Sequence, residues 1–596
     1  MYLSKLLKTK IMKLFNKYII VAAFLCLTMA SCEDFLDKPT EDAYNVDNYY
    51  LTDAQCLAGV NYLYNSPWYD FQRGFFKVGD ILSGNLYMGS SAYMNFSLNG
   101  TDEDLINMSY SLWAVIGHSS TVYNNLQDSP ATESVVEQCM GECLVWKAFA
   151  YFYLVRSFGE VPIIHNVEEE LENGTYNEAV KVKRADIYEY IIMTLEKAME
   201  LLPKSSSSGR IDYYCAEGLL AKVYLTKAGV GGSLDADDMA MAASYAKDVI
   251  DNSGRELMEN YEDIFRLANN MCDESLIAWR WTAEGSVWTA QNSLQCDLGL
   301  TGFDEFGDTW GDWTDPTVDL QDAFGIDLLA QTPDTWLNYY DTRLKATMML
   351  PGSTYSYFWA DQGGFDYLAF IYDSDYNSSN AGQLNSSTGV NCVKHLYGNA
   401  QDHVDGIGHS AAYMYNSLAT HILRLADVYL VYAEAMTGTS GVTTDADALN
   451  AFYQVRHRSV SSYQMPTSLT WEEIWNERRL EFALEGDRWY DYVRVSYYNP
   501  TFCINDLIAQ RRSYYYGLDD LYSTYYNTGN WTVDTSSMAY YDAATAVNPA
   551  AMMKTDPDTG MDYFYMPFPT EDVELNPNLG SSVDGVHVDV RSTYSY

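Results

Sequence analysis

The chain has 596 residues, with 81 acidic and 36 basic side chains and a formal net charge of −45. This charge argues against nucleic acid and anionic lipid surfaces as partners. The length allows a substantial core and two or more domains, although single large helical folds of this size occur. The 52 tyrosines and 14 tryptophans are a surplus of rings that can stack on sugars or peptides, but we expect most of them to fill helix interfaces.

The N-terminal segment predicts a secretory leader. Five lysines precede an apolar run from Tyr18 to Met29, and Ala30-Ser31 then places small residues before Cys32. The run is too short to span a membrane, and the pattern is typical of a lipoprotein signal peptide over residues 1–31, cleaved before Cys32. Acylation of Cys32 would anchor the mature chain through an acidic tether, residues 32–50. Met1 and Met12 are both compatible with the start of this leader.

Apolar residues then recur with the 3.6-residue period of helices. Thr52 and Asp53 cap the first helix, and Pro203 ends the fourth. The predicted helices cover residues 52–65, 104–126, 133–159, 185–202, 213–228 and 237–250. Cys139 and Cys143 stand one turn apart on the third helix, where buried thiols are expected and a disulfide is the alternative.

A short internal repeat indicates paired helices. Ala221-Lys-Val-Tyr-Leu225 recurs as Ala426-Asp-Val-Tyr-Leu430, and an alanine-rich helix follows each copy, at residues 237–250 and 445–458. Small residues at this spacing let two antiparallel helices approach closely, as in tetratricopeptide hairpins. The sequence therefore predicts a mainly α fold.

Between Met271 and Asn416 the helical period fails, and glycine, aspartate, serine and aromatic residues dominate. Residues 302–316, GFDEFGDTWGDWTDP, place Trp310 and Trp313 among several aspartates. Such rings can stack on the C–H face of a sugar while carboxylates reach its hydroxyls. A packed loop is an equally good interpretation. The tyrosine-rich residues 511–531 are either a surface loop or an additional binding face.

Metal sites are weakly indicated. Asp308, Asp312 and Asp315 are oxygen ligands suited to calcium, but their spacing is not that of an EF-hand loop. Residues 555–560 predict a hairpin turn between short strands, and the acidic pattern continuing to Asp562 lacks a glutamate at the twelfth position. The eight cysteines after the leader form no C-x-x-C pair, which argues against zinc. We expect no cofactor, with a structural calcium as the alternative.

Residues 470–494, TWEEIWNERRLEFALEGDRWYDYVR, predict two consecutive helices. Thr470 and Glu473 form a capping box, and Gly486 is the expected stop before a second helix near Asp487. The apolar stripe of the first helix is Trp471, Ile474, Trp475 and Phe482.

The charges of this segment need partners. Glu477, Glu481 and Glu485 occupy successive i,i+4 positions, where each pair would repel by about 0.2–0.5 kcal/mol. Arginines and aromatic rings are interleaved with them, which predicts a half-buried Arg–carboxylate network. The arginines expected in it are Arg478, Arg479, Arg488 and Arg494. A glycosidase pair is the weaker alternative, because arginines would keep both carboxylates ionised whereas a general acid needs a raised pKa.

The string NERRLEFALEGDRWYDYVR resembles the C-terminal signature of the SusD/RagB family, outer-membrane lipoproteins that bind nutrients for a TonB-dependent transporter. EDFLDKPT after Cys32 is similar to the opening of mature SusD-like chains. The ending also resembles the family's closing pattern, with Pro567, Pro569, Glu571, Asn576, Pro577 and Leu579 in place. The resemblance implies a SusD-like fold with tetratricopeptide-type hairpins and a large loop-rich ligand-binding half with short strands. It also implies a SusC-like transporter as partner and a lipid-anchored position on the outer membrane at the cell surface.

The resemblance also suggests where a ligand is bound. In the family, contacts come from the middle region and from a loop near the N-terminal helices, here residues 83–100. The candidate ligand-binding residues are Tyr87, Tyr93, Asn95, Phe96, Trp288, Asp308, Trp310, Asp312 and Trp313. We divide the mature chain into an N-terminal SusD-like region, residues 51–270, and a C-terminal region, residues 271–596. The C-terminal region is loop-rich at 271–414, helical at 415–500, and made of loops and a tail at 501–596.

These features predict a non-enzymatic protein that captures an oligosaccharide and delivers it to the transporter. A RagB-like peptide-binding lipoprotein is the alternative, and a glycoside hydrolase is a weaker one. No G-x-S-x-G, H-E-x-x-H or phosphate-cradling glycine loop is present, so we expect no catalytic residues. A scaffold that binds only the transporter remains as a further alternative.

Overall fold

The computed structural model describes residues 49–596, apart from short gaps at 176, 207–208, 283–287, 304–308, 379–381, 399–400, 403, 405–407, 409–415 and 543–546. The predicted leader, Cys32, almost all of the predicted tether and Asp308 therefore lie outside the described residues. Within the described residues no helix is both long and apolar enough to cross a membrane.

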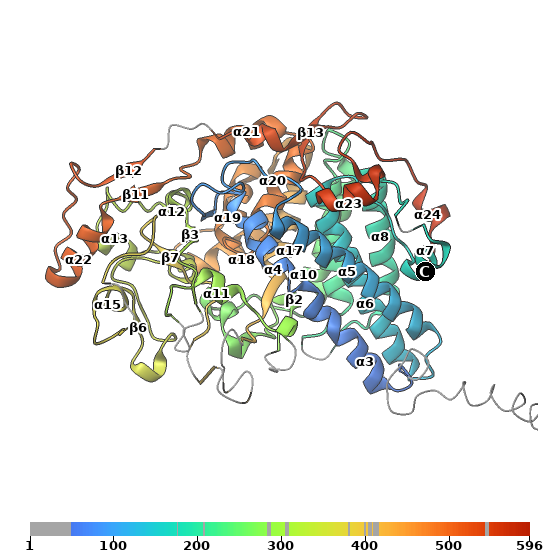
Figure 1. Ribbon diagram of the computed structural model, residues 1–596, viewed down its shortest axis with the longest axis horizontal. Helices are drawn as coiled ribbons and strands as arrows, with labels where there is room; N and C mark the ends of the chain where they lie inside the picture. Colours follow the sequence, from blue (N-terminus) through green and yellow to red (C-terminus); the bar gives the residue numbers. More distant parts are fainter. Residues whose placement is uncertain are drawn as a thin grey trace, which may run out of the picture.

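The described chain is mainly helical, and its long helices lie together on one side of the molecule (Figure 1). They are α3 (Asp53–Asn61), α5 (Glu103–Gln127), α6 (Glu133–Phe158), α8 (Arg184–Leu201), α9 (Tyr213–Lys227) and α10 (Ala236–Asn252). All six were predicted. Thr52 accepts a hydrogen bond from the Gln55 amide in a complete capping box, so the predicted cap of the first helix is confirmed. Cys139 and Cys143 are buried free thiols.

The repeated motif marks the centre of a helix stack. Helix α10 packs against both α9 and α17 (Leu425–Thr437), which in turn packs against α18 (Ala446–Ser459). Lys222 and Asp427 follow the first alanine of each motif copy, and they form a buried ion pair at 2.6 Å. The two copies therefore face one another, as the tetratricopeptide-type arrangement predicts.

The other side of the molecule holds short elements, as expected from the loss of helical period after Met271 (Figure 1). Between residues 271 and 416 no described helix exceeds six residues. The short helices are α11 (Leu294–Leu298), α12 (Val318–Ala323), α13 (Pro333–Leu337), α14 (Arg343–Thr347) and α15 (Tyr367–Tyr372). Other short helices lie outside this region: α4 (Phe71–Phe76), α7 (Val167–Asn173), α23 (Thr570–Leu575) and α24 (Val590–Thr593).

Within the described residues, the strands form two-stranded antiparallel sheets. They are β1 (Leu86–Tyr87) with β3 (Asp315–Pro316), β2 (Ser275–Trp279) with β8 (Thr420–Arg424), β4 (Met348–Met349) with β7 (Asn391–Cys392), and β5 (Thr354–Tyr355) with β6 (Phe365–Asp366). The later pairs are β9 (Val442–Thr443) with β10 (Leu469–Thr470), β11 (Tyr514–Tyr516) with β12 (Ala539–Tyr541), and β13 (Met553–Thr555) with β14 (Asp562–Phe564). The last pair confirms the predicted hairpin around residues 555–560.

Helices α19 (Trp471–Glu481) and α20 (Arg488–Ser496) lie between the two sides, followed by α21 (Pro500–Ala509) and α22 (Leu518–Thr528). The capping box of Thr470 and Glu473 is confirmed. Gly486, at φ +73°, stands in the turn before α20, and α19 has already ended at Glu481.

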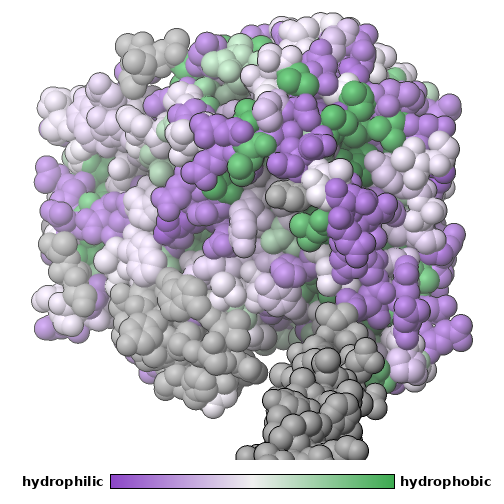
Figure 2. Space-filling model, turned by 45° about the vertical axis from the view of Figure 1, so that its right-hand side comes forward, coloured by the Kyte–Doolittle hydropathy of each residue, from purple (hydrophilic) through white to green (hydrophobic). Residues whose placement is uncertain are grey.

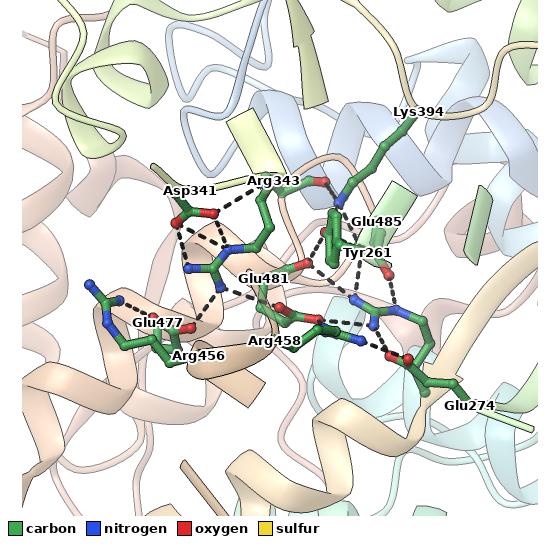
Figure 3. A network of polar contacts seen from close by, with 12 residues as sticks. Tyr261, Glu274, Asp341, Arg343, Lys394, Arg456, Arg458, Glu477, Glu481 and Glu485 are labelled. Carbon is green, nitrogen blue, oxygen red and sulfur yellow. Dashed lines mark hydrogen bonds and ion pairs between the residues drawn. The ribbon is translucent and has the colours of Figure 1, made fainter. Parts of the chain in front are cut away.

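The predicted charge network exists, but the expectation that it is half-buried was wrong. The side chains of Glu477 and Glu481 are fully buried, and that of Glu485 is 5% exposed. The three glutamates also do not pair with the arginines of α19 and α20. Side chains adjacent in sequence on a helix point about 100° apart, so they do not face one another. Instead, cations from other segments surround the glutamates (Figure 3). They are Arg343 of α14, Lys394, Arg424 of β8, and Arg456 and Arg458 of α18.

The arginines of the C-terminal helices serve a second cluster. Arg478 pairs with Asp427 at 2.6 Å and with Asp491 at 3.1 Å, and Arg494 pairs with Glu434 at 2.6 Å. Arg488 lies over the ring of Trp475, and Arg479 pairs with Asp319 at 2.7 Å. The ion pairs of the two clusters connect α19 and α20 to α17 and to the loop-rich region. They therefore fix the position of that region relative to the helices.

Candidate ligand-binding face

The two segments predicted to contact a ligand meet through a strand pair. In the β1–β3 ladder, Leu86 is opposite Pro316 and Tyr87 is opposite Asp315. The Thr317 hydroxyl donates to the Gly84 carbonyl at 2.6 Å, and the Thr317 amide donates to the Asn85 carbonyl at 2.9 Å. These backbone contacts place the loop after α4 beside the loop that carries Trp310 and Trp313.

Trp310 presents its ring to solvent in a fixed orientation. Its side chain is 41% exposed, while its Nε1 donates to Oδ1 of the buried Asp297 at 3.1 Å. Asp297 also pairs with Arg73 at 3.3 Å. Burial raises the pKa of Asp297, and Arg73 opposes this shift. A ring held at one edge and open on its surface can stack on a ligand with little further loss of side-chain entropy.

Trp313 is half-buried beside this position. Its ring lies 5.8 Å from that of Phe76, and the Lys77 ammonium lies 5.4 Å from the Trp313 ring centroid. Lys77 itself pairs with Asp104 at the start of α5. The contacts fix the ring from the side of the N-terminal helices and leave part of it accessible.

The aspartates of this loop have different roles. Asp312 is half-buried; it accepts from the Thr301 amide at 3.1 Å and from the side-chain amide of the exposed Asn385 at 3.3 Å. Asp315 is buried and accepts from the Ser387 amide at 2.9 Å and from the Asn391 side chain at 3.2 Å. Burial raises the pKa of Asp315 well above its usual range. Asp312 and Asn385 therefore offer polar atoms near the rings, whereas Asp315 joins the loop to its neighbours.

The described residues contain no group of three or more histidine, cysteine or acidic side chains that could hold a metal ion. At the other segment weighed for calcium, Asp556 pairs with the buried Arg184. Asp562 accepts from Thr555 at 2.5 Å. These two carboxylates already have protein partners.

A tyrosine ribbon extends the face beyond the predicted residues. The ring of Tyr87 lies 6.4 Å from that of Tyr514, which stacks on Tyr541 at 4.9 Å and 24° across the β11–β12 ladder. Tyr516 and Tyr541 are each 46% exposed. Tyr514 and Tyr516 lie within the tyrosine-rich residues 511–531 considered as an additional binding face, whereas Tyr541 lies outside that segment. The available signal was the i,i+2 spacing of Tyr514 and Tyr516, which puts both side chains on one side of a strand.

Other predicted residues of the first loop face inward. Tyr93 is 2% exposed and donates to Asp102 at 2.7 Å, and Phe96 is 1% exposed under the Arg512 guanidinium, 4.7 Å away. Asn95 is exposed. Trp288 begins the short helix Trp288–Ala290, but its side chain, like Asp308, lies outside the described residues. The β1–β3 pairing thus brings together the segments that carry Tyr87, Trp310, Asp312 and Trp313, whereas Tyr93 and Phe96 lie in the core.

The glutamates considered as a glycosidase pair do not lie on this face. Glu477, Glu481 and Glu485 all lie in the buried network (Figure 3). Burial would raise the pKa of Glu481, but Arg458, Arg424 and Arg343 lower it to about 2. The pKa of Glu485 is also lowered, by Arg424 and Lys394 acting against burial. Neither carboxyl is held in the protonated form that a general acid requires.

On the helical side, which comes forward in Figure 2, hydrophobic residues form separate small groups among hydrophilic ones. The exposed apolar residues of that side include Leu171, Val180 and Leu575. Scattered groups of this size are normal on protein surfaces.

Comparison with known proteins points to one family. A family model described as "SusD family" matches residues 329–583, and one described as "Starch-binding associating with outer membrane" matches residues 34–225. A SusD-like protein of Bacteroides ovatus is 32% identical over 515 residues, covering 84% of this chain and 87% of the relative. A SusD-like protein of Formosa agariphila is 24% identical and covers 83% of this chain and 94% of the relative.

Solved structures agree in fold. A crystal structure with xylogluco-oligosaccharide superposes with a TM-score of 0.71 at 27% identity, covering 90% of this chain and 99% of the other. A laminarin-binding SusD-like protein has a TM-score of 0.56 at 21% identity, covering 76% and 93% of the two chains.

Proposed function

The chain belongs to the SusD family, and from that premise we propose that it captures an oligosaccharide on the face formed by Tyr87, Trp310, Trp313, Tyr514 and Tyr541. The observation that carries the proposal is Trp310, whose ring is open to solvent while its indole nitrogen is bonded to Asp297. A sugar ring presents a patch of C–H groups that fits such a surface.

Polar groups beside the rings suit the hydroxyls of a saccharide. Asp312 lies on the same loop as Trp310 and Trp313 and is half-buried, and the exposed Asn385 donates to it at 3.3 Å. Arg73, which is 52% exposed at the Asp297 ion pair, adds a donor. An open arrangement of rings with a few polar groups favours an extended chain of sugars over a small enclosed ligand.

The nature of the ligand is suggested by relatives. The structure with xylogluco-oligosaccharide is 27% identical to this chain, and it supports a neutral plant-type glycan as the first ligand to test. The chain's net charge of −45 also disfavours strongly anionic polysaccharides at long range.

We further propose that the protein is anchored to the outer membrane through Cys32 and passes its glycan to a SusC-like TonB-dependent transporter. The lipoprotein-type leader and the family description, "associating with outer membrane", support this location. The proposed process breaks no bond. The buried Glu481 and Glu485 do not supply a general acid for one, because neighbouring cations lower the pKa of both.

Calorimetric titration with a panel of polysaccharides tests the proposal. We expect Trp310→Ala to cost about 1–3 kcal/mol of binding free energy, or roughly 5- to 150-fold in Kd. Tyr541→Ala should give a smaller loss, because its ring lies toward the end of the face. The matched control is Tyr110→Ala, which removes a ring that is 68% exposed on α5.

Unchanged affinity in the Trp310 variant would place the ligand elsewhere. Binding of peptides and of no glycan would favour the RagB-like alternative. Release of reducing ends from the bound glycan would exclude a purely binding role.

A further inference from the structure

A polar pocket of about 210 Å³ lies on the helical side, and none of its lining residues belongs to the proposed glycan-binding face. Its lining residues come from three segments: between α8 and α9 (204–212), after the end of α10 (253–255), and around the start and end of β2 (271–280). Since one water occupies about 30 Å³ of liquid, the space suits a small ion with its hydration better than a sugar chain.

The pocket is basic in a strongly acidic protein. Its lining contains four cationic side chains, Lys204, Arg210, Arg255 and Arg280, against two acidic ones, Asp212 and Asp273. The chain as a whole has 36 basic and 81 acidic residues. The gathering of cations at this point therefore runs against the overall charge of the molecule.

Two of the arginines already have carboxylate partners. Arg210 donates to both oxygens of the buried Glu142, at 2.9 and 2.8 Å. Arg255 pairs with Asp212 at 2.8 Å. These ion pairs orient both guanidinium groups at the pocket wall.

Arg280 differs from its neighbours. Its Nη1 donates to the Asn270 carbonyl and its Nη2 to the Ser275 hydroxyl at 3.3 Å, and its buried Nε has no hydrogen-bond partner. Among the described residues it forms no ion pair with a carboxylate. By contrast, the buried Arg343 and Arg424 are each paired with two or more carboxylates.

The charge of Arg280 is therefore uncompensated. Burial lowers the pKa of this arginine, and the nearby Arg255 lowers it further. A guanidinium that has lost much of its hydration and has no counter-charge is a favourable site for an anion, because each added charge-assisted hydrogen bond relieves this cost.

We propose that this pocket binds a small oxyanion, a phosphate, sulphate or carboxylate group, between Arg280, Arg255 and Lys204. The planar guanidinium favours oxygen atoms that it can reach two at a time. Lys204 is exposed at the pocket with its ammonium 2.9 Å from the centroid of the Tyr213 ring, and it would turn from that ring to cover the open side. The group is either a free ion or the charged substituent of a larger ligand.

The test titrates inorganic phosphate, sulphate and acetate into the purified full-length chain at constant ionic strength, with chloride as the reference anion. Calorimetry and the thermal midpoint are the two readouts. We expect saturable binding of at least one oxyanion, weakened by about 10- to 100-fold in Arg280→Gln because one charge-assisted interaction is lost. Lys204→Gln, on the surface, should weaken binding several-fold.

The matched control is Lys197→Gln, which removes a partly exposed lysine of α8 that is paired with Glu200. It should leave binding unchanged. Glucuronate, glucose 6-phosphate and glucose distinguish a free ion from a substituted sugar. If the group belongs to a larger ligand, the two charged sugars should compete with phosphate and glucose should not.

The absence of saturable binding to the wild-type chain would overturn the proposal. Equal affinities of wild type, Lys204→Gln and a folded Arg280→Gln would also overturn it. Trp310→Ala should leave oxyanion binding intact, so failure of this proposal and failure of the glycan proposal are separate results.

Discussion

Replacing Glu481 by glutamine removes the central negative charge of the network that holds α19 between the two sides of the molecule. The Glu481 side chain is fully buried and accepts from Arg424 at 3.0 Å, from Arg343 at 3.2 Å and from Arg458. Glutamine keeps the shape but leaves three guanidinium groups with one fewer counter-charge. Loss of one partner from a buried ion pair typically costs about 3–5 kcal/mol.

The pKa of Glu481 gives an independent magnitude. It is lowered from 4.5 to about 2 in the folded chain, and a difference of roughly 2.5 units corresponds to about 3 kcal/mol of stability at neutral pH. Because the folded-state pKa is below the unfolded one, this contribution is fully present above pH 4.5 and is lost as the pH falls toward 2. The difference between wild type and Glu481→Gln should therefore be largest at pH 7 and shrink in acid.

Urea denaturation at pH 7, 4 and 3, followed by circular dichroism, measures this difference. Glu472→Gln is the matched control, because Glu472 is exposed on the same helix, and it should change the free energy of unfolding by no more than about 0.5 kcal/mol. If Glu481→Gln unfolds within about 0.5 kcal/mol of wild type at pH 7, or if the difference is the same at pH 3, the network does not stabilise the fold in this way.

Three further substitutions test other parts of the structure. Lys147 is buried and donates to the His165 carbonyl at 2.6 Å, and burial lowers its pKa to about 7. Between pH 7 and 10 the unfolded chain therefore binds more protons than the folded chain, so wild type should gain stability relative to Lys147→Met as the pH rises. A stability difference that does not change with pH would contradict this. Gly486→Ala should cost about 2–4 kcal/mol in urea denaturation, because its φ is +73° and a Cβ would overlap the ring of Phe75, and a loss below about 1 kcal/mol would mean that the turn adapts easily. Thr470→Ala should cost about 1 kcal/mol through loss of the capping box, and Thr470→Ser should restore most of it.

Features that depend on neighbouring residues were predicted well from the chain alone. The long helices, the caps at Thr52 and Thr470 and the hairpin at residues 555–560 all follow from interactions within a few residues of each other. The family signature and the tail also indicated membership correctly. In each of these cases the pattern and its physical cause lie in one continuous segment.

The polar network shows what such reasoning misses. The sequence predicted that Glu477, Glu481 and Glu485 need cations, but it assigned them to arginines of the same segment. The actual partners lie on other segments, since adjacent positions on a helix point in different directions. Arg343 and Arg424 come from more than fifty residues away, and Arg456 and Arg458 come from the preceding helix α18.

The proposed binding face could be assembled only in part from the sequence, for the same reason. Trp310 and Tyr87 were recognisable as candidates, but the β1–β3 pairing that joins their loops is a long-range contact. Tyr93 and Tyr541 look alike in sequence, yet one donates to Asp102 in the core and the other stacks on an exposed hairpin. The chain by itself determined which segments are helices and which family they belong to. Only tertiary packing decided which rings are buried and which meet solvent, because exposure depends on segments that are distant in sequence.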